Sequence, residues 1–147
     1  FPKARFVITH RDPAISIVSY ASMISMFRRT AYNNSDFKRL GPYVATVFKK
    51  GLDRAISVRK KIDSNKRIID VHCEDIQNLP IQTIEKTCDF LNINTNKEDH
   101  KKIKKWLKNK NTDFPRRHYY EFEKYGVDKA LIEKDFYYYN DQKYKST

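Results

Sequence analysis

Arg11 and Ser19 are the residues whose types and spacing best suit chemistry in this chain, namely the binding of a phosphate group. Arg11 follows an apolar run, Arg5–Thr9, and precedes Asp12-Pro13, a pair typical of a helix start, with aspartate as the cap. A guanidinium gives a doubly charged phosphate paired, charge-assisted hydrogen bonds, and a nearby helix start favours an anion. Ser19, eight residues after Arg11, adds a neutral hydroxyl donor. The alternatives are an Arg11–Asp12 ion pair and a hydrogen bond from Ser19 to the carbonyl four residues earlier.

Other side chains that could do acid–base or binding chemistry occur at three places. His10 lies between the apolar run and Arg11, and we expect a structural role for it. Glu74 and Asp75 are adjacent, so we expect them to point apart and to cap a turn or pair with basic side chains, not to act as an acid–base pair. An aromatic and basic segment later in the chain could close over a ligand or pack on the surface, and both interpretations stay open. Its residues are Arg116, Arg117, His118 and Tyr120.

The composition indicates a folded domain. The 147 residues are 39% hydrophobic and 14% aromatic, which is enough to pack a core. No apolar run approaches the ~20 residues of a membrane helix, and the start has no signal-peptide pattern. Cys73 and Cys88 have neither CxxC spacing nor a companion histidine cluster, so we expect small buried residues in a reducing compartment and neither a disulfide nor a metal site. The abrupt start at Phe1, close to an apolar strand, predicts a fragment whose N-terminal part is missing.

The net charge of +12 would suit nucleic acid, an acidic membrane surface or a small anion. The excess is spread along the chain, however, and the basic helical stretches lack the interleaved aromatic residues that stack on bases. The basic clusters over which the charge is spread are Lys49-Lys50, Arg59-Lys60-Lys61, Lys101-Lys102, Lys104-Lys105 and Arg116-Arg117. We therefore expect solvated helix faces, and a non-catalytic basic module that binds nucleic acid or an acidic surface is the alternative function.

Two short β-rich runs separated by helical patterns predict an α/β fold with a parallel sheet. We expect a buried strand at Arg5–Thr9, a second strand at Arg67–Cys73 and a turn from Glu74 to Pro80. Two strands cannot bury both faces of a sheet, so more strands are expected upstream. The expected helices cover Pro13 to about Arg29, Pro42 to about Ile62, Ile81–Leu91, a segment to Lys108 behind a capping box at Thr95–Glu98, and Asp128–Tyr139.

The apolar positions of these helices predict the core. The expected inward residues are Ala14, Ile17, Val18, Ala21 and Ile24 in the first helix, Val44, Val47, Phe48, Ala55 and Ile62 in the second, and Ile103, Trp106 and Leu107 in the helix that ends at Lys108.

Four segments resemble, in the same order, segments of the sulfotransferases that use 3′-phosphoadenylyl sulfate (PAPS). The stretch from Phe1 to Ser19 resembles the segment in which an arginine at a strand end and a serine eight residues later hold the nucleotide's 3′-phosphate. Cys73–Pro80 is similar to the family's Tyr-Glu-Asp-Leu-x-x-x-Pro, and Ile84–Ile93 to a helix end of the Phe-Leu-Gly-Leu type. His118–Val127 resembles the family's C-terminal His-x-Tyr followed by glycine.

This resemblance implies part of a P-loop-like three-layer α/β fold and the transfer of a sulfuryl group from PAPS to an acceptor hydroxyl or amine. Arg11 and Ser19 would bind the 3′-phosphate, and His118 and Tyr120 are further cofactor-binding candidates. In the family the phosphosulfate loop and the general base lie upstream of these segments, so the catalytic residues are unknown and the chain is expected to be inactive alone. Cys73 stands where the family usually has a tyrosine that touches the adenine. No metal is implied.

The same resemblance implies the organisation of the chain. Residues 1–140 are expected to be the C-terminal part of a single sulfotransferase domain, and residues 141–147 a polar tail. The expected partners are the nucleotide co-substrate and an unidentified acceptor, without nucleic acid or a membrane span. The expected location is the cytoplasm, and a Golgi-lumen form with an upstream anchor is the alternative.

Overall fold

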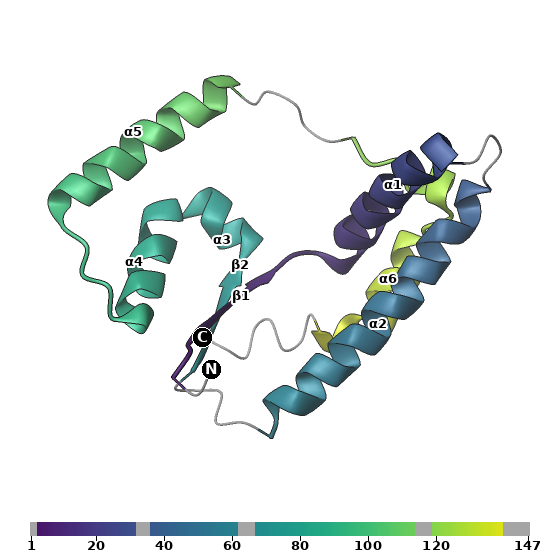
Figure 1. Ribbon diagram of the computed structural model, residues 1–147, viewed down its shortest axis with the longest axis horizontal. Helices are drawn as coiled ribbons and strands as arrows, with labels where there is room; N and C mark the ends of the chain where they lie inside the picture. The colour runs from purple at the N-terminus through teal and green to yellow at the C-terminus, as the bar shows by residue number, and fades with distance from the viewer. Residues whose placement is uncertain (1–2, 32–35, 62–66, 114–118, 140–147) are drawn as a thin grey trace. The chain divides into compact units, whose positions relative to one another are not determined.

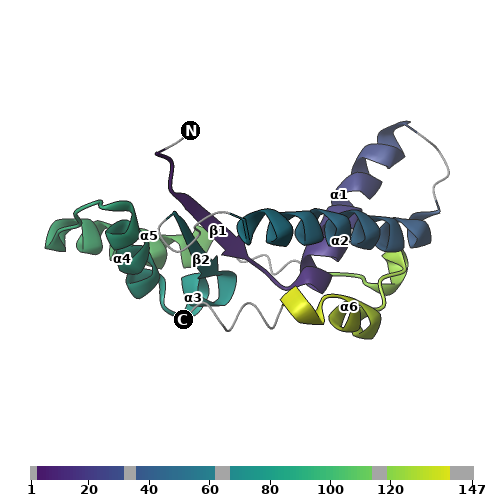
Figure 2. The ribbon, with the colours of Figure 1, turned by 90° about the horizontal axis from the view of Figure 1, so that it is seen from below.

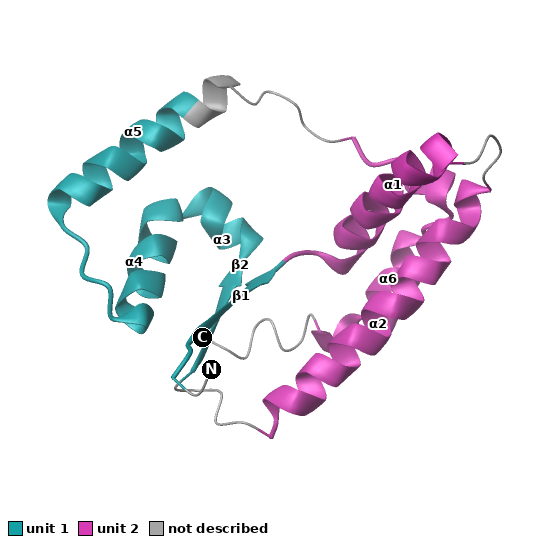
Figure 3. Cartoon of the chain, in the orientation of Figure 1, with its two compact units in different colours: residues 1–10, 64–118 teal, residues 11–63, 119–147 magenta. Residues whose placement is uncertain are grey.

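A computed structural model describes residues 3–31, 36–61, 67–113 and 119–139, with the backbone alone from 110 to 113 (Figure 1). The chain divides into two compact units, each built from two segments that are far apart in the sequence (Figure 3). Unit 1 comprises residues 1–10 and 64–118, and unit 2 comprises residues 11–63 and 119–147. The described residues form a mixed α/β structure that is mostly helical and contains a small parallel sheet.

The sheet of unit 1 pairs β1 (Phe6–His10) in parallel with β2 (Ile68–His72), in a register that runs from Phe6 opposite Ile68 to His10 opposite His72. The predicted parallel pairing is thus confirmed. The predicted burial of the first strand is wrong, because the side chains of Phe6, Val7 and Ile8 are exposed. The helices α3 (Cys73–Asn78) and α4 (Pro80–Leu91) pack against β2, whose Val71 is buried.

A short helix, α3, stands where the sequence predicts a turn. Glu74 and Asp75 lie exposed in its first turn, where carboxylates interact favourably with the helix dipole. The Leu79 amide donates to the Asp75 carbonyl, and Pro80 begins α4 directly afterwards. The Leu79-Pro80 pair therefore marks a junction between two helices, since proline is tolerated in a first helical turn.

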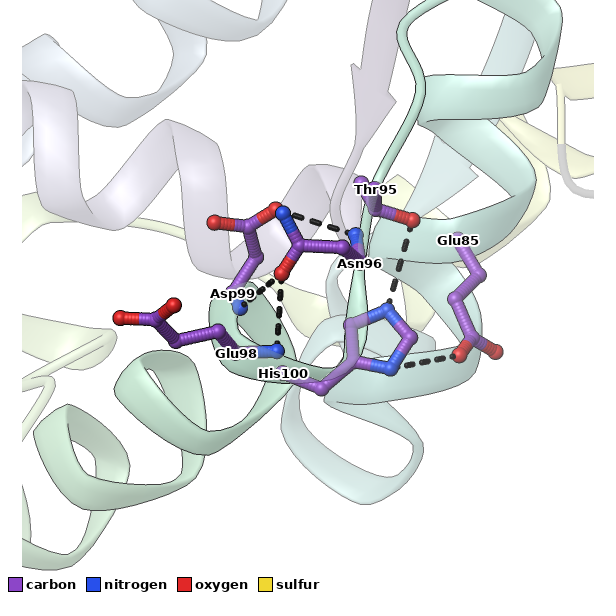
Figure 4. Close-up of polar contacts among 6 residues, drawn as sticks. All are labelled: Glu85, Thr95, Asn96, Glu98, Asp99 and His100. Atoms are coloured by element: carbon purple, nitrogen blue, oxygen red, sulfur yellow. Dashed lines mark hydrogen bonds and ion pairs between the residues drawn. The ribbon is translucent and has the colours of Figure 1, made fainter.

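The capping box that starts α5 (Lys97–Asp113) lies one residue later than predicted (Figure 4). The Asn96 side-chain oxygen accepts hydrogen bonds from the amides of Glu98 and Asp99 at 2.8 and 3.0 Å. A carboxylate oxygen of Asp99 accepts from the Asn96 amide at 3.0 Å, which closes the box. The Thr95 hydroxyl lies instead 3.4 Å from Nε2 of His100.

Replacing Asn96 with alanine is expected to lower the free energy of unfolding by about 1 kcal/mol, because two amides in the first turn of α5 lose their acceptor. Urea denaturation followed by circular dichroism measures the change. The matched control is Thr95→Ala, which removes the residue that the sequence pattern favoured as the cap. A larger loss in Thr95→Ala than in Asn96→Ala would contradict the observed register.

Trp106 does not belong to the core as predicted, since its side chain is 57% exposed. Ile103 and Leu107, predicted with it, are half-buried. The apolar stripe of α5 is therefore narrower than the sequence pattern indicated.

Unit 2 is built mainly from the helices α1 (Pro13–Ala31), α2 (Leu40–Arg59) and α6 (Lys129–Asp135). The 3₁₀ helix η1 (Phe37–Arg39) precedes α2, and the 3₁₀ helix η3 (Glu123–Tyr125) precedes α6. Figure 2 shows α6 below α1 and α2. The buried apolar side chains of this unit form one core, which consists of Ala14, Ile17, Val18, Ala21, Leu40, Val44, Tyr125, Val127, Ile132 and Phe136. None of the described helices is long and apolar enough to cross a membrane.

The inward face is predicted well for α1 and poorly for α2. Four of the five predicted residues of α1 are buried, and the fifth, Ile24, is partly buried. On α2, Val44 is buried and Phe48 partly buried as predicted. Val47 and Ala55 are exposed, however, and Leu52 packs against the core in their place. Ile62 lies outside the described residues.

Candidate functional site

The start of α1 is capped as the sequence predicts. A carboxylate oxygen of Asp12 accepts from the Ile15 amide at 3.0 Å, and the Asp12 carbonyl accepts from the Ser16 amide at the same distance. Pro13 occupies the first helical position. The Asp12 carboxylate already accepts from one first-turn amide and adds negative charge at the start of α1. The binding of an anion near this helix start therefore depends more on neighbouring side chains than on the helix terminus itself.

Arg11 lies exposed immediately before this cap. Its Nη2 donates to the Tyr120 hydroxyl at 2.9 Å, and its guanidinium carbon lies 5.8 Å from the centre of the Tyr120 ring. Among the described residues, neither Asp12 nor any other carboxylate forms an ion pair with Arg11. The guanidinium has five N–H donors, so most of them remain available to an anion.

Ser19 is half-buried on α1. Two other serines of the helix donate to backbone carbonyls, Ser16 to Asp12 at 3.0 Å and Ser25 to Ser22 at 2.8 Å. The Ser19 hydroxyl makes no such bond to any described residue, so the alternative of a bond to the carbonyl four residues back is not found. Its donor is therefore available to a ligand.

The structure brings Arg11 and Tyr120 together, although 109 residues separate them in the sequence. In the described part of the chain, Ser19 forms no hydrogen bond with Arg11 or Tyr120. About two turns of helix separate Ser19 from Arg11. Ser16 and Ser19 share a face of α1, being three residues apart. His118, the other predicted binding residue, lies outside the described residues, as do Arg116 and Arg117.

The segment that carries Tyr120 is held in place by Tyr125. This side chain is buried, and its hydroxyl lies 3.2 Å from that of Ser25 on α1. Burial alone raises the pKa of Tyr125, but hydrogen bonds from Ser22 and Ser25, together with the charge of Lys124, outweigh it and leave the pKa below its ordinary value. Sequence reasoning missed this contact, although Ser25 interrupts the apolar face of α1 at a core position.

In unit 1, His10 ties the two strands together. Its Nε2 lies 2.6 Å from a carboxylate oxygen of Asp70, and the two side chains are 12% and 8% exposed. The His10 ring also lies 5.0 Å from the ring of His72. This geometry agrees with the structural role expected for His10. Asp70 was missed, although a charged residue within a β-branched run was a usable signal.

A model described as the sulfotransferase family matches residues 1–97. The chain belongs to the sulfotransferase family. The matched region of this sulfotransferase chain includes Arg11 and Ser19 but ends before Tyr120. No curated protein matches the sequence.

A solved structure agrees with this assignment. Sulfotransferase STF9 from Mycobacterium avium superposes with a TM-score of 0.81 at 19% identity, over 97% of this chain and 36% of that one. At this identity the likeness shows the fold alone. Our sulfotransferase chain thus spans about a third of the length of that enzyme.

The cysteines of this sulfotransferase chain are free. Cys73 and Cys88 are both half-buried, whereas the sequence predicts that they are buried. Cys73 begins α3 directly after β2.

Proposed function

We propose that this chain is the nucleotide-binding part of a PAPS-dependent sulfotransferase, with Arg11 and Ser19 as the ligands of the 3′-phosphate. Family membership supports the reaction class. The observation that carries the proposal is Arg11, an exposed guanidinium that no described carboxylate neutralises. The serine hydroxyl eight residues later, unused within its helix, is the second support.

The side chains present suit a phosphate monoester. The guanidinium supplies charge and a planar fork of donors, and the Ser19 hydroxyl supplies one neutral donor. The Tyr120 hydroxyl accepts from the guanidinium and so restricts its orientation. When bound, PAPS supplies an activated sulfuryl group, which passes to an acceptor hydroxyl or amine as the acceptor loses a proton and adenosine 3′,5′-bisphosphate leaves.

In this proposal the residues of the chain bind and orient the nucleotide and do not break its bonds. The chain has three glycines, Gly41, Gly51 and Gly126, and these do not form a Gly-rich phosphate loop. We therefore expect no sulfuryl transfer by this chain on its own.

The experiment that tests the proposal compares two nucleotides by isothermal titration calorimetry. Adenosine 3′,5′-bisphosphate is expected to bind at least about tenfold more tightly than adenosine 5′-monophosphate, because only the first carries the phosphate that Arg11 and Ser19 contact. Equal affinities would remove the 3′-phosphate site from the proposal.

Tyr120→Phe is expected to weaken binding of adenosine 3′,5′-bisphosphate about fivefold, because the guanidinium of Arg11 loses the acceptor that orients it. The same titration measures the change. The matched control is Tyr119→Phe, since Tyr119 is the adjacent tyrosine and is 91% exposed. An equal effect of both substitutions would show that the Arg11–Tyr120 contact does not matter to the site.

A further inference from the structure

The helix α5 carries a strongly basic surface. Between residues 97 and 109 it has six lysines and two carboxylates, Glu98 and Asp99. Five of the lysines each lie three or four residues from another, so together they form a stripe about 16 Å long. We name this stripe the α5 lysine surface; it consists of Lys97, Lys101, Lys104, Lys105 and Lys108, all of which are exposed.

The nearby carboxylates do not neutralise this surface. Glu98 forms an ion pair with the sixth lysine, Lys102, at 3.3 Å. A carboxylate oxygen of Asp99 accepts from the Asn96 amide in the capping box. Among the described residues, no carboxylate forms an ion pair with any of the five lysines of the α5 lysine surface. Their positive charge is therefore available to a partner.

This arrangement of charge lowers the stability of the helix. Like charges three or four residues apart repel one another along a helix, and a cation in the first turn opposes the helix dipole. Lys97 is the first residue of α5. A helix face that meets only solvent typically alternates acidic and basic residues, which the α5 lysine surface does not. An anionic partner would remove the repulsion.

The α5 lysine surface is not the side of the helix that packs within unit 1. His100, Ile103 and Leu107 lie three and four residues apart on the packed side, and Ile103 and Leu107 are half-buried. The Nδ1 atom of His100 lies 3.4 Å from a carboxylate oxygen of Glu85 on α4. The helix is thus amphipathic, with one side held to α4 and the lysines exposed to the outside.

The side chains suit a layer of many anions better than a nucleic acid. All six cations are lysines, which act as point charges, whereas specific recognition of phosphate favours the planar fork of arginine. Trp106, next to Lys105, is 57% exposed, and an indole ring beside basic residues is typical of the boundary between membrane and water. Clusters of basic residues on an amphipathic helix are typical of binding to anionic lipids.

We propose that the α5 lysine surface docks this sulfotransferase chain on an anionic lipid bilayer, with the lysines over the acidic headgroups and Trp106 at the interface. The attraction is electrostatic, so salt weakens it. The inference does not rest on the proposed nucleotide site, because α5 belongs to unit 1, whereas Arg11 and Ser19 belong to unit 2.

The test is sedimentation of the chain with mixed vesicles of phosphatidylserine and phosphatidylcholine, compared with vesicles of phosphatidylcholine alone. Binding to the mixed vesicles only is expected. The triple variant Lys101→Gln, Lys104→Gln, Lys105→Gln is expected to bind the mixed vesicles at least about thirtyfold more weakly, because three charges near the lipid are lost. Glutamine has nearly the helix propensity of lysine, so α5 is retained.

The matched control is the triple variant Lys50→Gln, Arg54→Gln, Lys60→Gln, whose exposed cations lie on α2 and at the cap that follows it. It lowers the net charge of +12 by the same three charges. Its affinity for the mixed vesicles is expected to stay within about threefold of that of the intact chain, since these cations do not contact the lipid. An equal loss in both triple variants would overturn the inference, because the net charge alone would then explain the binding.

Trp106 reports where the chain touches the vesicle, since it is the single tryptophan of the sequence. Its fluorescence is expected to shift to shorter wavelength with the mixed vesicles and to stay unchanged with phosphatidylcholine. Binding without this shift, equal binding to both kinds of vesicle, or no binding would each overturn the inference. If the α5 variant keeps its affinity for vesicles but loses affinity for an oligonucleotide or for polyglutamate, the partner is a nucleic acid or an acidic protein, and the lipid assignment is wrong.

Discussion

Replacing Gly126 with alanine is expected to lower the free energy of unfolding of the chain by about 3 kcal/mol or more. Gly126 has a φ of 63°, in the left-handed region that a residue with a Cβ atom rarely adopts. A Cβ there would also lie 2.1 Å from the Lys38 carbonyl oxygen, a backbone atom of η1. Relief of this clash requires the segment after η3 to move away from η1.

Urea denaturation followed by circular dichroism measures this loss. The matched control is Gly51→Ala, because a Cβ at Gly51, within α2, meets no atom within 4 Å. That substitution is expected to stabilise the chain by up to about 1 kcal/mol, since alanine is the better helix former. Equal stabilities of the two variants would show that the Gly126 turn is not packed against η1.

The Gly126 turn connects the fold to the candidate site. Tyr125 and Val127, on either side of it, are core residues, and Tyr120 of the same segment packs against that core. A Cβ at Gly41 would lie 2.4 Å from the Tyr125 carbonyl oxygen, so the start of α2 also approaches this backbone closely. Tyr120 therefore reaches Arg11 from a segment that two close backbone approaches hold in place.

The parts of the fold that the sequence predicts are those set by local chemistry. The start of α1 follows from Asp12 and Pro13, and its buried face follows from apolar residues at helical spacing. The capping box of α5 lies one residue later than predicted because Thr95 and Asn96 can both cap and each has a carboxylate three residues later, so the sequence pattern fits both registers. In the structure a carboxylate oxygen of Asp99 accepts from the Asn96 amide.

Properties that depend on what packs against an element were not predicted. An apolar run such as Phe6–His10 does not reveal how many neighbours will cover it, and the three residues after Arg5 prove exposed. On α2 the apolar residues suit more than one face, and contact with the core selects Leu52 over Val47. Trp106 is exposed for the same reason, since the position of its neighbours sets its burial.

In the candidate site, too, the residues were predicted from the sequence but their contacts were not. Spacing and resemblance indicate Arg11, Ser19 and Tyr120 from the sequence. The contact between Arg11 and Tyr120 depends on the packing of η3 and Tyr125 against α1, which no local pattern contains. Asp70 was missed because only the pairing of β1 with β2 brings it to His10.

Replacing Arg11 with alanine is expected to weaken the binding of adenosine 3′,5′-bisphosphate about a hundredfold, because two charge-assisted hydrogen bonds to the 3′-phosphate are lost. Arg11→Lys keeps the charge without the planar fork, so about a tenfold loss is expected. Titration calorimetry measures both. The control is Arg54→Ala, which removes an exposed arginine from α2 and lowers the net charge equally.

The stability of these variants separates binding from folding. Arg11 is exposed and bonds to one neutral hydroxyl, so its loss is expected to change the free energy of unfolding by less than about 0.5 kcal/mol. If Arg54→Ala weakens nucleotide binding as much as Arg11→Ala, the net positive charge of the chain explains the binding. The assignment of Arg11 to a 3′-phosphate site is then wrong.

A double-mutant cycle then tests the role of Tyr120. If the Tyr120 hydroxyl acts by orienting the guanidinium, Tyr120→Phe is expected to weaken nucleotide binding in the intact chain and to have no effect once Arg11 is alanine. A fivefold loss in both backgrounds would mean that Tyr120 contacts the nucleotide independently. Because Arg11 and Tyr120 come from opposite ends of the chain, coupling between them would show that the packing of unit 2 assembles the phosphate site.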